Sequence, residues 1–116
     1  MQPERLSITP EMRQCIEATS ACYSACAETL GNSLDGGGLA DRRHVRVLVD
    51  CCEVLQATQN ALLRGSKLSI LLATVCVEAC EGVSESYRRL ERSDELLASS
   101  AEACDETAEC CRRLMI

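Results

Sequence analysis

Apolar and small residues recur every three or four positions along most of this chain, which is the spacing that places side chains on one face of an α-helix. The pattern covers four segments, at about residues 10–30, 40–64, 67–91 and 94–114. Strand signals are absent from the sequence. Four long helices, the last three joined by short turns, predict an all-α fold, an antiparallel four-helix bundle that residues 1–116 form as a single domain.

The expected helix ends follow from capping residues and glycines. Thr9-Pro10-Glu11 is typical of a helix start, and Gly31-Asn32 predicts that the first helix ends near Leu30. The glycines at 36–38 then indicate the longest loop of the chain. Gly65 is expected to end the second helix, and Ser66 and Ser93 to cap the third and fourth.

The inward positions of each helix alternate in steps of four and three, as in the seam of a bundle. They are Cys15, Ala18, Cys22, Cys26 and Thr29; then His44, Leu48, Cys51, Leu55, Thr58 and Leu62; then Ser69, Ala73, Cys76, Cys80, Val83, Tyr87 and Leu90; and finally Leu97, Ser100 or Ala101, Cys104, Thr107, Cys111 and Leu114. Cysteine occupies eight of these positions, out of ten cysteines in the chain. The other two, Cys52 and Cys110, lie ~100° around the helix from their neighbours, so we expect them at helix–helix seams or outside.

Composition narrows the class of protein. There is no Phe or Trp and there are only two Tyr, so Leu, Val, Ala, Cys, Thr and Ser must fill the core. A net charge of −6 without a free basic cluster argues against binding to nucleic acid or to an anionic membrane. No apolar run approaches ~20 residues, and the first residues do not resemble a signal peptide, so the expected location is the cytosol. In a reducing compartment, cysteines are metal ligands or buried thiols rather than disulfides.

The cysteine spacing favours a soft metal ion. No C-x-x-C occurs, but C-x-x-x-C occurs twice within helices, at Cys22–Cys26 and Cys76–Cys80. The Cβ atoms of such pairs lie ~5–6 Å apart, more than the ~3.8 Å that a disulfide prefers. Thiolates select Cu(I), zinc or iron–sulfur clusters, and Cu(I) accepts two or three sulfur ligands. The candidate ligands are Cys15, Cys22, Cys26, Cys51, Cys76, Cys80, Cys104 and Cys111, with His44 near one end of the bundle and Met12 and Met115 at the opposite end.

Two alternatives to Cu(I) binding remain open from the sequence. Buried cysteine also acts as a small hydrophobic side chain, so the chain can be a structural or interaction protein in which sulfur only fills the core. The second alternative is a protein that buffers zinc or thiol redox state. Catalysis has little support, because one His and no recognisable paired-carboxylate or nucleophile arrangement leave no acid–base set to name.

The second and third helices are apolar over more than one stripe. The inward seam of the second helix is flanked by Val45, Val47, Val49 and Cys52. That of the third helix is flanked by Ile70, Leu71, Val75 and Val77. A second apolar face is usually buried on a partner. We therefore expect a homo-oligomer, a dimer or a tetramer, formed through these two helices.

Several stretches resemble the cysteine-rich four-helix-bundle copper-storage proteins of bacteria. Residues 49–55 (VDCCEVL) and 62–66 (LLRGS) are similar to that family's D-C-A-E-x-C…L-R-G-S run, and residues 76–80 and 103–115 to its cysteine-rich third and fourth helices. The resemblance implies a cytosolic homotetramer whose interior binds many Cu(I) ions through thiolates, with His or Met near an open end.

The chain departs from the pattern of this family at several inward positions. Further cysteines are expected at six inward positions that hold other residues, namely Leu55, Val83, Tyr87, Leu97, Ser100 and Thr107. Leu90 stands where a His is expected, and His44 stands at what looks like a cysteine position. The resemblance therefore implies copper storage with reduced capacity, and an apolar plug around Val83, Tyr87 and Leu97.

Overall fold

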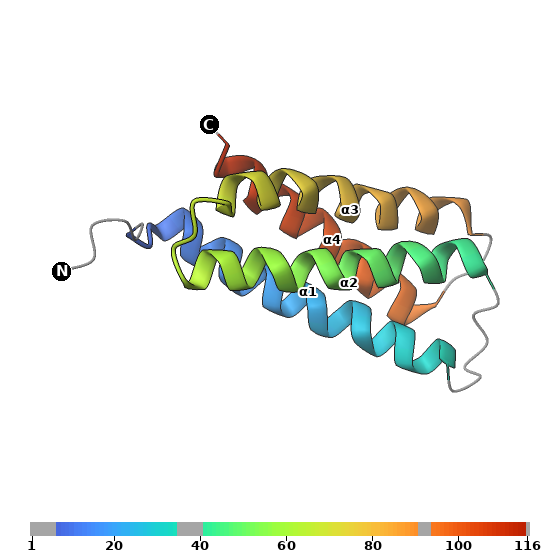
Figure 1. Cartoon of the computed structure of the whole chain (residues 1–116). Coiled ribbons are helices and arrows are strands. Elements are labelled where there is room, and N and C mark those ends of the chain that lie inside the picture. The colour runs from blue at the N-terminus through green and yellow to red at the C-terminus, as the bar shows by residue number, and fades with distance from the viewer. Residues whose placement is uncertain (1–6, 35–40, 91–93, 116) are drawn as a thin grey trace.

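The computed structural model describes residues 7–34, 41–90 and 94–115, and within them it contains the four predicted helices and no strand. The helices are α1 (Pro10–Leu34), α2 (Arg42–Leu63), α3 (Ser69–Arg89) and α4 (Glu95–Arg113). Consecutive helices run in opposite directions (Figure 1). Helices α1 and α3 each pack against both α2 and α4, so the four surround one interior, and the predicted all-α bundle is confirmed. None of the described helices is long and apolar enough to cross a membrane.

The expected end of the first helix was wrong. Helix α1 continues through Gly31 and Asn32 to Leu34, four residues beyond the predicted end. A glycine within a helix costs ~1 kcal/mol relative to alanine, which the tertiary packing of a 25-residue helix offsets. The glycines at 36–38 lie outside the described residues, as does the predicted cap Ser93.

Side chains cap three of the helix starts. The Oγ1 atom of Thr9 accepts a hydrogen bond from the backbone N–H of Met12, and Asp41 accepts one from His44. Asp94 caps α4 by accepting from two backbone N–H groups of its first turn. Ser66 was predicted to cap α3, but Leu68 precedes the first helical residue and Ser66 accepts from the N–H of Leu68 instead.

Helix α2 ends at a glycine in the left-handed conformation, Gly65, with φ of 65°. The N–H of Gly65 donates to the carbonyl of Leu62, and the N–H of Ser66 donates to the carbonyl of Ala61. These two bonds form a Schellman motif, which satisfies carbonyls at the end of the helix and turns the chain toward α3.

The interior matches most of the predicted inward positions, with two changes of register. Thr19 is buried in place of Ala18, and its hydroxyl donates to the carbonyl of Cys15. Ser86 is buried in place of Tyr87, which is half-buried, because Ser86 pairs with the imidazole that occupies the interior at this end. The predicted plug therefore lacks Tyr87, whereas Val83 and Leu97 are buried as expected.

We predict that Gly65→Ala lowers the free energy of unfolding by ~1–2 kcal/mol, because an L-residue is strained at positive φ. The matched control is Gly82→Ala within α3, where an added Cβ meets no atom within 4 Å. That change should stabilise the protein by ~0.5–1 kcal/mol. Urea unfolding followed by circular dichroism measures both, and equal effects of the two substitutions would contradict the role of Gly65.

Candidate metal centre

All four helices direct cysteines into the interior. The eight predicted thiols are fully buried: Cys15, Cys22 and Cys26 on α1, Cys51 on α2, Cys76 and Cys80 on α3, and Cys104 and Cys111 on α4. All are free thiols in this structure. The helical spacing therefore brings sulfur from every wall of the bundle to its axis.

Cys104 lies at the centre of the densest part of this interior. Its Sγ atom is 3.6 Å from that of Cys22 and 3.9 Å from that of Cys26. On the other side, it is 3.9 Å from the Sγ of Cys51, which is itself 3.9 Å from that of Cys80. Two groups of three thiols result, each with its sulfur atoms within 4.8 Å of one another: the first triad (Cys22, Cys26, Cys104) and the second triad (Cys51, Cys80, Cys104).

The remaining thiols extend this cluster toward the end of the bundle where α1 begins and α4 ends. The Sγ atoms of Cys15 and Cys111 lie 3.4 Å apart. Interaction with Cys111 and with Cys80 lowers the pKa of Cys76, so this thiol lies between the pair and the second triad. The eight sulfurs thus form one continuous file along the interior.

The dimensions of the triads suit a three-coordinate ion. With a metal–sulfur bond of ~2.3 Å, the length found in zinc thiolates, three sulfurs around a planar centre lie ~4.0 Å apart. In each triad two of the three sulfur–sulfur separations are 3.6–3.9 Å, close to this value, and the third is within 4.8 Å. Among the described residues, neither group contains a fourth thiolate, an imidazole or a carboxylate. Structural zinc is almost always four-coordinate, whereas Cu(I) is selected by soft thiolates.

Hydrogen bonds between the thiols divide them into groups that lose a proton easily and groups that hold it. Hydrogen bonding with Cys104 lowers the pKa of Cys51 to about 6, although burial opposes the shift. Hydrogen bonding with Cys111 lowers the pKa of Cys76 to about 4 in the same way. Their partners are affected in the opposite sense, since hydrogen bonding with Cys22 raises the pKa of Cys104 and hydrogen bonding with Cys15 raises that of Cys111. A soft cation bound here would displace the protons that remain on the thiols.

His44 lies apart from the two triads. Its imidazole is fully buried, and Nδ1 is 2.8 Å from the hydroxyl of Ser86. Nε2 is buried without a hydrogen-bond partner in the described part of the chain. Burial lowers the pKa of His44, although Asp41 opposes the shift, so the ring is neutral at pH 7. On α2, Leu48 separates His44 from Cys51.

Met12 and Met115 lie at the end of the bundle opposite His44 (Figure 1). Met12 is 8% exposed and packs with the core, one turn before Cys15. Met115 is exposed, and its sulfur accepts a hydrogen bond of 3.2 Å from the hydroxyl of Thr74.

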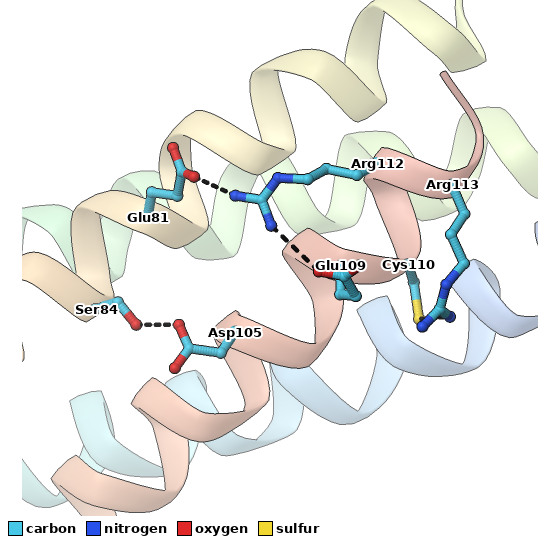
Figure 2. Close-up of polar contacts among 7 residues, drawn as sticks. All are labelled: Glu81, Ser84, Asp105, Glu109, Cys110, Arg112 and Arg113. Atoms are coloured by element: carbon cyan, nitrogen blue, oxygen red, sulfur yellow. Dashed lines mark hydrogen bonds and ion pairs between the residues drawn. The ribbon is translucent and has the colours of Figure 1, made fainter. Parts of the chain in front are cut away.

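Cys52 and Cys110 are half-buried, as the helical geometry predicted. Hydrogen bonding with Cys26 raises the pKa of Cys52, so this thiol lies against the wall of the cluster. Figure 2 shows Cys110 beside Arg113, whose guanidinium is 3.9 Å from the sulfur. The same view shows the outer seam of α3 and α4, where Arg112 pairs with Glu81 and Glu109, and Ser84 donates to Asp105.

A cysteine-lined bundle with thiol triads at metal-binding distances defines a class of protein suited to hold soft metal ions. Comparison with protein families supports this conclusion, because the family model described as copper storage protein matches residues 8–116. The chain therefore belongs to the copper storage protein family, a family of storage proteins rather than enzymes. Comparisons with curated proteins and with solved structures give no match.

We predict that N-ethylmaleimide modifies Cys52 and Cys110 of the folded, reduced, metal-free protein well before the other eight cysteines. The buried thiols react only after local opening of the bundle, which should lower their rate of modification by about 100-fold or more. Intact mass against time measures the reaction, and the unfolded protein in guanidinium is the control in which all ten react together. Rapid native labelling of more than two sites would contradict the buried file.

Proposed function

We propose that this protein binds and stores Cu(I) through the cysteine thiolates of its interior. The observation that carries the proposal is the pair of buried thiol triads that share Cys104. Each triad offers one three-coordinate position, and the shared sulfur bridges the two ions. A bridging thiolate lets neighbouring cations lie close together, because its negative charge stands between them.

The same geometry weighs against both alternatives. A zinc site lacks its fourth ligand in either triad of the described residues. Cysteine used only as core filler has no need to bring sulfurs from four helices into one file, since alanine and valine fill similar space. Membership of the copper storage protein family supports copper as the ion that is stored.

The proposed ligands are the eight interior cysteines, with the thioethers of Met12 and Met115 as further ligands at the end where Cys15 and Cys111 lie. His44 belongs to neither triad. The file ends at Cys26, beyond which Leu48, Val83 and Leu97 fill the interior. We therefore infer storage of a few ions rather than many. Free thiols throughout the chain suit a reducing compartment, and we propose the cytosol.

We predict that Cys104→Ser lowers the number of tightly held Cu(I) ions by about two per chain, because both triads lose a soft sulfur ligand. The fold should persist, since a serine hydroxyl can donate to the carbonyl one turn earlier, as those of Thr19 and Thr58 do. Anaerobic titration with Cu(I) against a competing chelator measures the uptake, and circular dichroism checks the fold.

The matched control is Cys110→Ser, which alters a cysteine of the same helix outside the file. It should bind as many Cu(I) ions as the unchanged protein. Equal uptake by the Cys104→Ser protein would refute the shared-sulfur site, and displacement of Cu(I) by excess Zn(II) would favour the zinc alternative.

We also propose that two or more copies associate through α2 and α3. Most of the exposed large apolar side chains lie on these helices or on the turn between them: Val49, Leu63, Leu68, Ile70, Leu71 and Val75. A groove between the two helices is lined by Val47, Val54, Val75 and Ala79, with acidic residues at its edge. Exposed Arg43 and Arg46 at the start of α2 supply the opposite charge when a second copy packs antiparallel.

We predict that Leu71→Glu, at a side chain that is 62% exposed, converts the oligomer to a monomer without loss of fold, because a carboxylate would be buried in the interface. Sedimentation velocity at micromolar concentration measures the change. Ser99→Glu on the exposed face of α4 is the control and should leave the oligomer intact. An unchanged protein that sediments as a 12.6 kDa monomer would exclude this surface as an interface.

A further inference from the structure

The closest hydrogen-bonded thiol pair of the described residues joins the two terminal helices. The Sγ atoms of Cys15 on α1 and Cys111 on α4 are 3.4 Å apart, and the residues are separated by 96 positions in the chain. A disulfide requires an approach to ~2.05 Å, which small side-chain rotations on two separate helices can provide. The pairs Cys22–Cys26 and Cys76–Cys80 lack this freedom, because each lies within one helix that fixes its Cβ atoms ~5–6 Å apart.

The position of the pair also favours reaction. Cys111 lies in the last turn of α4, which ends at Arg113. Helix ends open more readily than helix centres, so this buried pair gains access to solvent without unfolding of the bundle. A surface hollow lined by Met12, Arg113 and Leu114 lies at the same end. The next closest pair, Cys22 and Cys104 at 3.6 Å, lies deeper, since Cys104 is nine residues before the end of α4 (113 − 104).

We propose that Cys15 and Cys111 form an oxidative modification site, at which hydrogen peroxide converts the two thiols of the metal-free protein into a disulfide. One thiolate attacks a peroxide oxygen, the O–O bond breaks, and the departing hydroxide takes a proton to become water. The sulfenic acid then reacts with the second thiol, which forms the S–S bond and releases a second water. In total, two thiols and one H₂O₂ give one disulfide and two H₂O, and each sulfur is oxidised by one electron.

The modification has two consequences for the bundle. It ties α1 to α4 at the end where Met12 lies, and it removes two thiolates from the file. The two triads keep all their sulfurs, since neither includes Cys15 or Cys111. Bound metal at this end should block the reaction, because a coordinated thiolate is no longer free to attack peroxide.

Digestion after glutamate gives a direct test, because it isolates Cys15 on residues 12–17 and places Cys111 on residues 110–116. The Cys110→Ser protein should be used, so that Cys111 is the only thiol of the second peptide. The reduced, metal-free protein is treated with H₂O₂, the remaining thiols are blocked with N-ethylmaleimide, and the non-reduced peptides are analysed by mass spectrometry. We expect a loss of about 2 Da in the intact protein and a linked pair of these two peptides, which a reductant separates.

Cys15→Ser and Cys111→Ser should each abolish the linked pair, and having both keeps the test valid if one variant does not fold. A preferred link between Cys22 and Cys104, a disulfide between two chains through Cys52, or oxidation to sulfinic acid without any link would overturn the proposal. The test needs no copper, so it stands separately from the proposed storage function. The Cu(I) uptake of the oxidised protein is then titrated to measure the effect on capacity. It should fall by the number of ions held near Cys15 and Cys111, and the ions at the two triads should be retained.

Discussion

The close approach of the four helices is the constraint on which the rest of the structure depends. An interior without Phe or Trp is filled by leucines and by many small side chains, and sulfur is the largest atom that many of the small ones carry. Helices lined by such residues approach until the sulfurs touch, which gives the Sγ separations of 3.4–3.9 Å. The same contact that completes the packing therefore places soft ligands at the spacing that one small ion requires. Packing and metal binding are thus two properties of a single arrangement.

Protons maintain this arrangement when no metal is present. Hydrogen bonding between neighbouring thiols lowers the pKa of Cys51 and Cys76 and raises that of Cys104 and Cys111. Some of the buried cysteines therefore lose their protons more readily than their neighbours do. A soft cation bound at a triad would displace the protons that its thiols still hold. The hydroxyl of Thr19 donates to a backbone carbonyl, whereas that of Thr58 donates to the carbonyl of Val54 and also contributes to the lowered pKa of Cys76.

The sequence predicted the fold well because one strong signal, the alternation of four and three, extends over every helix. It predicted the burial of all eight file cysteines for the same reason. It failed where the outcome depends on contacts between helices. Ser86 is buried in place of the predicted Tyr87 because its hydroxyl is hydrogen-bonded to His44, which lies 42 residues earlier in the chain. The sharing of Cys104 by two triads depends on the axial offset of antiparallel helices, which spacing within one helix does not contain. The predicted end of α1 was wrong because Gly31, which has open space around it, is tolerated in a helix.

The two ends of the interior have opposite characters, and this difference limits what the bundle can hold. From Cys15 and Cys111 to Cys26, sulfur from facing helices lines the axis. Beyond Cys26 the interior is filled mainly by Leu48, Val83 and Leu97, with the buried hydroxyl groups of Thr29 and Ser100, up to the imidazole of His44. Among the described residues, Nε2 of His44 has no hydrogen-bond partner. In the described part of the chain that stretch holds no thiol, and burial lowers the pKa of His44, so its ring adds no charge at pH 7. The apolar half secures the fold whether or not ions are bound, because its packing involves no ligand. The thiol-lined half can then gain and lose ions while the helices stay in place.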